Sequence, residues 1–249
     1  MAIAFGATVE SAAQNKTSGT TLTFQPDSTV AVGDLLVICM ACDNNNATTP
    51  TVTCADNSAS GGTANAYTVT TRNSGQALPG AGVAGSLIYC LVTRQIETTD
   101  TITATLSNAV TPKALVAQTF TGASGSLRGT AAVASATSGT AASVANTNPL
   151  SGDLVVAMVT SEGITTGADS DTTNGSWSTQ VQLGTTGGSD AANVKVSMQY
   201  KVVTATGTQT FDSTVQNSDW ACISVAFQPT AAAASLVPLR PIISHLRGR

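Results

Sequence analysis

The chain has 249 residues, of which 10% are charged and 4% aromatic, and its formal net charge is −4. Threonine, serine, alanine, glycine and valine are abundant, so the core must be built from small and β-branched side chains packed in sheets, and long amphipathic helices are not expected. Three arginines lie within residues 236–249, which leaves seven basic against fourteen acidic residues on the rest, a net charge of −7. A body of this sign repels nucleic acid and anionic membranes, and we expect neither as a partner.

The N-terminus and the cysteines indicate the cellular compartment. The opening residues MAIAFGATVES lack the basic and apolar segments of a secretory signal, and no run approaches the roughly 20 apolar residues of a membrane span. We therefore expect synthesis in a cytosol. Five cysteines, an odd number spread over strand-like segments, fit reduced and buried thiols better than a disulfide framework.

The first strong strand signal is DLLVICMA at residues 34–41, which is apolar throughout. Such a run predicts a central strand that is covered on both faces. By contrast, TITATL at residues 101–106 alternates apolar and hydroxyl side chains, which predicts a strand with one exposed face. Polar turn clusters such as DNNNATTP and DNSASGGTAN separate the strands.

Cys39 and Cys42 lie within the first of these strands, at a spacing that invites a metal hypothesis. Residues three apart on a strand point to opposite faces, so these two thiols cannot bind one ion. Cys54 and Cys90 could complete a four-thiolate set, but the second half of the chain has no equivalents. We interpret the cysteines as buried core residues and predict no metal and no cofactor.

The pattern of the first half returns in the second. VGDLLVICMA returns as SGDLVVAMVT, SLIYCLVT as VSMQYKVVT, and ALVAQTF as ACISVAF. The separation falls from 119 residues, between Gly33 and Gly152, to 107 between Phe120 and Phe227. Shorter loops between retained apolar strands are what divergence after duplication produces. The sequence therefore predicts an internal duplication.

The strand spacing predicts an all-β fold of two tandem antiparallel β-sandwich repeats, jelly-roll or immunoglobulin-like in kind. The repeats are residues 1–124 and 125–230, with a small, flexible join at 121–129. A single large sandwich, to which each repeat supplies half of the strands, is the alternative. Residues 231–249 are predicted to form an extended C-terminal arm.

Few residues could carry catalysis. The only histidine, His245, lies in the arm, so the body holds no Ser/His/Asp or Cys/His constellation. We predict a protein that is not an enzyme. A polysaccharide-degrading enzyme is the weakest alternative, because it needs a pair of carboxylates in a groove.

Two further features bear on binding. ADSDTTNGS, with Asp169, Asp171 and Asn174, resembles a calcium loop, but Gln180 stands where the bidentate glutamate belongs, so a polar hairpin loop with Asx turns is the preferred interpretation. Five aromatic residues could form a sugar-stacking platform, although a core role is favoured; they are Tyr67, Tyr89, Trp177, Tyr200 and Trp220.

The C-terminal segment LVPLRPIISHLRGR is too apolar for a solvated linker and carries two prolines that disfavour a helix. We predict that it docks on another protein surface as an extended arm, rather than being a frayed terminus. The residues predicted to dock are Leu239, Arg240, Pro241, Ile242, Ile243, Leu246, Arg247 and Arg249.

These patterns together resemble a loosely defined group of bacteriophage virion proteins, which combine duplicated GDLLV, AYTV and TITAT strands with low charge and a short Arg/Pro tail. The resemblance spans nearly the whole chain and brings no catalytic residue with it. It implies a structural role on the phage head as a decoration protein, or on the tail as a minor or fibre-associated component, after synthesis in the host cytoplasm.

The resemblance also implies partners: other virion proteins and further copies of the same chain in symmetric assembly. The alternative function is a carbohydrate-binding or host-adhesion module, in which loops at residues 44–46 and 169–174 contact a host-surface glycan, with or without calcium.

Overall fold

The structure, a computed structural model, describes residues 2–44, 50–59, 61–74 and 82–231. Within these ranges it consists of strands β1 to β17 and one short 3-10 helix, η1 (Asp190–Ala192), and the paired strands run antiparallel. The all-β prediction is confirmed. No helix in the described ranges is long and apolar enough to cross a membrane.

The N-terminal half, residues 2–121, forms two sheets. The first, here called inner sheet 1, has the order β1 (Ala4–Glu10), β9 (Lys113–Thr121), β4 (Leu35–Asp43), β7 (Val83–Leu91) and β6 (Thr68–Asn73), with β2 (Gln14–Asn15) also paired to β9. The second, outer sheet 1, has the order β3 (Gly19–Phe24), β8 (Ile102–Val110) and β5 (Val52–Asp56). These sheets pack face to face as a β-sandwich.

The C-terminal half, residues 123–230, repeats this plan. Inner sheet 2 has the order β10 (Ala123–Leu127), β17 (Trp220–Pro229), β13 (Leu154–Glu162), β15 (Val194–Val202) and β14 (Val181–Gly184), with β11 (Ala132–Ala136) also paired to β17. Outer sheet 2 is the pair β12 (Ala141–Asn146) and β16 (Gln209–Thr214).

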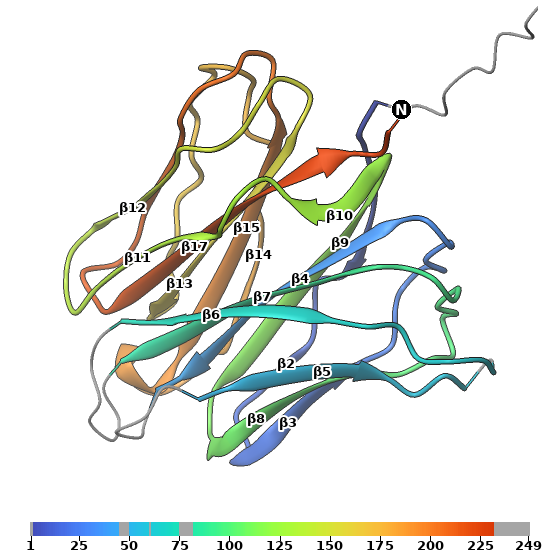
Figure 1. Cartoon of the computed structure of the whole chain (residues 1–249). Helices are drawn as coiled ribbons and strands as arrows, with labels where there is room; N and C mark the ends of the chain where they lie inside the picture. Colours follow the sequence, from blue (N-terminus) through green and yellow to red (C-terminus); the bar gives the residue numbers. More distant parts are fainter. Residues whose placement is uncertain (1, 45–49, 60, 75–81, 232–249) are drawn as a thin grey trace, which may run out of the picture.

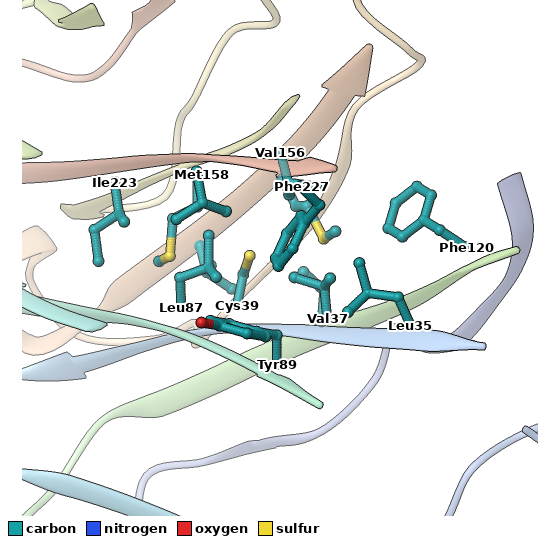
Figure 2. Packing of buried hydrophobic residues seen from close by; sticks show 14 of the residues in the cluster. Leu35, Val37, Cys39, Leu87, Tyr89, Phe120, Val156, Met158, Ile223 and Phe227 are labelled. Atoms are coloured by element: carbon teal, nitrogen blue, oxygen red, sulfur yellow. The ribbon is translucent and has the colours of Figure 1, made fainter. Parts of the chain in front are cut away.

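The two halves stack through their inner sheets, which gives four layers and three apolar cores (Figure 1). A central core fills the space between the inner sheets, and each half has its own core between its inner and outer sheet. Figure 2 shows the central core, with Leu35, Val37 and Tyr89 of one half facing Val156 and Phe227 of the other.

Burial on both faces explains the continuous apolar runs. In β4, Leu35, Val37 and Cys39 enter the central core, while the alternate residues enter the core of the N-terminal half. In β13, Leu154, Val156 and Met158 enter the central core, while Val155, Ala157 and Val159 enter that of the C-terminal half. Because successive strand residues point to opposite faces, a strand between two cores is expected to be apolar along most of its length.

The main contacts across the central interface come in pairs that are exchanged when the halves are exchanged. The contact of β4 with β15 corresponds to that of β13 with β7, that of β7 with β17 to that of β15 with β9, and that of β6 with β17 to that of β14 with β9. These pairs follow the pattern of an isologous two-fold interface, whereas the contacts of β10 with β7 and β4 and of β11 with β6 are more extensive than any contact of β1 or β2 with the other half. Duplication as the origin of this pattern stays a prediction.

The chain passes between the halves at Gly122, whose φ of 76° lies in the left-handed region that favours glycine. Residues 123–127, placed by sequence at a flexible join, form β10, so the predicted boundary between residues 124 and 125 falls inside a strand. Each half has the two layers of a sandwich, and the two also share a core.

Candidate functional site

The predicted docking residues of the arm, Leu239 to Arg249, lie outside the described residues. The described chain ends next to the crossing between the halves, where the Thr230 backbone N–H donates to the Gly122 carbonyl at 2.7 Å.

The cysteine positions agree with the strand geometry expected of them. Cys39 lies in the central core and Cys42 on the opposite face of β4, in the core of the N-terminal half. All five cysteines are free, and burial raises the pKa of the Cys42 thiol to about 12. In the described part of the chain, no group of three or more His, Cys, Asp or Glu side chains is placed to hold a metal ion.

The carboxylates of the acidic loop at residues 169–174 accept backbone N–H groups from the loop and from β16. Asp169 accepts the N–H of Asp171 at 2.7 Å, and Asp171 accepts that of Thr173 at 3.0 Å, which is the Asx-turn arrangement. Asp169 also accepts the N–H of Asp212 on β16 at 2.8 Å. Of the other loop expected to contact a glycan, residues 45 and 46 lie outside the described residues.

Three of the five aromatic residues considered as a platform, Tyr89, Trp177 and Trp220, are buried in the cores. Tyr67 is partly buried and donates its hydroxyl to Asp56 Oδ2 at 3.2 Å. Tyr200 is also partly buried, and it lines a pocket at one end of the central interface.

A pocket opens at this end of the interface, between the β1 and β9 edge of inner sheet 1 and the β14 and β15 edge of inner sheet 2. Its volume is about 260 Å³. Both halves contribute to its lining, which consists of Phe5, Thr8, Gln118, Ser178, Thr179, Val181 and Tyr200.

An aromatic stack forms one wall of the pocket. The Phe5 ring, 42% exposed, lies on the Tyr200 ring with centroids 5.5 Å apart and planes 5° apart. Phe120 is fully buried and makes edge-to-face contacts with both, at 6.2 Å from Phe5 and 4.9 Å from Tyr200. The exposed ring is thus held in a fixed orientation by a buried one.

Gln118 forms the deep side of the pocket. The residue is 3% exposed, and its Nε2 donates to Thr8 Oγ1 at 3.3 Å. Its Oε1 is buried and has no hydrogen-bond partner among the described residues. A buried carbonyl oxygen without a partner costs free energy relative to one that is hydrogen-bonded.

The rim from Ser178 to Thr179 is fixed by hydrogen bonds to β15. The Ser178 N–H donates to the Tyr200 carbonyl at 2.7 Å, and the Tyr200 N–H donates to Ser178 Oγ at 3.0 Å. The Gln199 side chain donates to the Ser178 carbonyl at 2.7 Å. The pocket is therefore preformed rather than assembled from loose loops.

A second polar cluster lies elsewhere along the central interface. Glu162 Oε1 accepts the Gly82 N–H at 2.9 Å, and Ser74 donates to Asp219 Oδ2 at 3.2 Å, so both bonds join the two halves. Burial, with the neighbouring charges of Asp219 and Asp43, raises the pKa of Glu162 to about 7. None of these acids lines the pocket.

Sequence reasoning missed Phe5, Thr8 and Gln118 as pocket residues. The strand register places Phe5 opposite Phe120 and Thr8 opposite Gln118. Sequence could have supplied one signal: Gln118 is a polar residue in the apolar run ALVAQTF, whose counterpart ACISVAF has valine at that position.

The fold and pocket define a four-layer, all-β protein with a small, uncharged cleft between its halves. No protein-family model, no curated protein and no solved structure matches the chain.

Proposed function

We propose that the protein is a non-enzymatic structural component of a bacteriophage virion, a head decoration protein or a tail or fibre-associated component. Its partners are other virion proteins and further copies of itself. It is made in the host cytoplasm and joins the particle by docking its C-terminal arm on neighbouring subunits.

The observation that carries this proposal is the closed packing of the body. Both inner sheets are covered on both faces, so the largest apolar surfaces of the chain are already buried within it. Such a body is rigid and offers no large apolar face for assembly, which leaves the apolar and basic arm as the segment suited to bind a neighbour.

Removal of residues 236–249 tests the proposal. The truncated chain should unfold at the same temperature as the full chain, because the three described cores are built from residues 3–227, yet fail to enter particles that lack the native protein. In a second variant, Arg240, Arg247 and Arg249 are all changed to alanine. This variant keeps the length and apolar residues of the arm, so it separates the contribution of charge to docking from that of apolar burial. Normal incorporation of the truncated chain would contradict the docking role.

The alternative function, carbohydrate binding in host adhesion, is favoured by a different observation: the pocket between the halves, with its exposed aromatic ring and hydroxyl-bearing rim. In the loop at residues 169–174, Asp169 and Asp171 already accept hydrogen bonds from backbone N–H groups of the protein. The pocket is the better candidate.

A further inference from the structure

We propose that the pocket lined by Phe5, Gln118 and Tyr200 binds one neutral sugar ring of a glycan. This inference rests on the carbohydrate-binding alternative and is independent of the arm. Three features of the pocket carry it: its aromatic wall, the unpaired carbonyl oxygen of the Gln118 side chain and its lack of charge.

The aromatic wall suits the apolar face of a sugar. Phe5 keeps 42% of its surface exposed although it is packed against Tyr200 and Phe120. An exposed ring of fixed orientation binds a ligand without a further loss of side-chain freedom. Because Phe5 and Tyr200 already stack on each other, no slot remains between them for a flat base to enter. The C–H face of a pyranose can instead lie against the outward ring surface.

The polar groups suit the hydroxyls of a sugar. Gln118 lines the pocket, and its buried Oε1 has no partner among the described residues. On rotation of the side chain toward the pocket, this oxygen can accept a hydrogen bond from a ligand hydroxyl. Thr8, Ser178 and Thr179 add side-chain hydroxyls to the lining. A few convergent polar groups beside an aromatic surface are typical of small-molecule sites.

The lack of charge selects a neutral ligand. Among the residues that line the pocket there is no Asp, Glu, Lys, Arg or His. Burial raises the pKa of Tyr200 above its ordinary value, so its phenol stays neutral. A phosphate or carboxylate would find no cation in the lining to replace its hydration.

Comparison with the other half shows that the pocket is a local departure from the shared plan. Phe120 contacts Tyr200 and Phe227 contacts Tyr89 with the same geometry, centroids 4.9 Å apart and planes at 75°. The partner of Phe227 across β10 and β17 is Leu127, where Phe120 has Phe5.

The two halves also differ at the position of Gln118. Gln118 pairs with Val37 on β4. In the other half, the residue equivalent to Val37 is Val156 on β13, and it pairs with Val225. The ring pairs Phe120–Tyr200 and Phe227–Tyr89 are thus alike. By contrast, the other half has Leu127 at the position of Phe5 and Val225 at that of Gln118. A buried amide with an unpaired oxygen, where the equivalent position holds valine, costs stability and needs a reason beyond packing.

Titration of the full chain with neutral methyl glycosides tests the proposal, with saturation-transfer NMR to detect contact and calorimetry to measure affinity. The probes are the methyl glycosides of glucose, galactose, mannose and N-acetylglucosamine, with glucuronate and adenosine as charged and nucleobase probes. At least one neutral glycoside should bind with a Kd of about 1 mM, the range expected of a ligand of this size.

Two variants locate the site. Phe5→Ala should weaken binding about five- to tenfold through loss of the ring contact, and Phe5→Trp should restore it. Gln118→Val, which copies the other half, should weaken binding without lowering the thermal stability. Val32→Ala removes an exposed apolar side chain outside the pocket and serves as the control.

The outcomes separate this inference from the virion proposal. Absence of binding by any neutral glycoside, equal binding by wild type, Phe5→Ala and Gln118→Val, or binding of adenosine or glucuronate instead would overturn the sugar site. None of these results bears on incorporation of the arm-truncated chain, so either proposal can fail alone.

Discussion

At the scale of single residues, Glu162 is a carboxyl group whose pKa is raised strongly by its surroundings. Its carboxyl is partly buried where the two halves meet, near the carboxyls of Asp219 and Asp43. Loss of hydration is the main cause of the raised pKa, and together with repulsion by the neighbouring acids it outweighs the hydrogen bond from Gly82.

This environment predicts that stability falls as the pH rises. The pKa of Glu162 is raised from 4.5 to about 7, so the folded protein binds more protons than the unfolded chain between these pH values. The stabilising effect of the protonated form is complete below pH 4.5 and is lost as the pH passes 7. The free energy of unfolding should therefore decrease between pH 5 and pH 8, by about 1 to 2 kcal/mol after allowance for partial exposure.

Urea denaturation at several pH values measures this effect. Glu162→Gln keeps an oxygen to accept the Gly82 N–H, so it should remove most of the pH dependence and raise stability at pH 8. Glu97→Gln, a change outside the central interface, is the control. An unchanged pH profile in Glu162→Gln would show that another group, such as Asp219 or Asp43, controls the dependence.

Only some of these residue positions can be predicted from the sequence. It places Cys39 and Cys42 on opposite faces of a strand, and the cores confirm it. It does not bring Phe5 to Tyr200, because that contact needs the register of β1 with β9 and the packing of one half on the other. Long-range packing of this kind leaves no periodic signal in one chain.

At the scale of elements, the strands β4 and β13 are the most predictable, because burial on both faces requires an uninterrupted apolar run. What covers the second face is not predictable from the run itself. In this fold it is the equivalent sheet of the other half, and Gly85 on β7 is a point where side chains of that sheet approach the backbone closely.

Gly85 tests how tightly the inner sheets pack. A Cβ at this position would lie 2.8 Å from Thr160 Cγ2 and 3.1 Å from Met158 Cε on β13. Gly85→Ala should therefore force the sheets apart or shift these side chains, with a loss of about 1 to 3 kcal/mol in the free energy of unfolding. Chemical denaturation measures the loss.

The chain supplies a matched control in Gly19 on β3, where a Cβ would meet nothing within 4 Å. Gly19→Ala should be neutral or slightly stabilising, because alanine loses less backbone entropy on folding. The double variant Gly85→Ala with Thr160→Ala removes the clashing groups and should recover part of the loss. Equal stability of Gly85→Ala and Gly19→Ala would contradict the close approach of the sheets.

At the scale of the whole molecule, the sequence predicts two similar β-sheet units but leaves open whether they form two sandwiches or one. The structure gives each half its own two layers and adds a third core between them. That core depends on complementarity between two surfaces that are each apolar. An apolar strand pattern indicates that a face is buried, but it does not indicate which surface covers that face.

The symmetric interface leads to a prediction about the separated halves. A chain ending at Gly122 would expose the central-core face of β4 and β7, and a chain beginning at Ala123 would expose that of β13 and β15. Exposed apolar sheets of this extent do not stay monomeric in water. Each half expressed alone should aggregate or pair with itself, while co-expression should give a 1:1 complex that unfolds in a single transition.

Light scattering and differential scanning calorimetry distinguish these states. The isologous pattern makes self-pairing of one half geometrically feasible. The mixed complex should nevertheless form in preference, because only it restores the hydrogen bonds that join the two halves, Gly82 to Glu162, Ser74 to Asp219 and Lys16 to Asn193. Two soluble monomers with independent unfolding transitions would mean that the central core contributes little. In that event the rigid body on which the virion proposal depends would be two hinged modules instead.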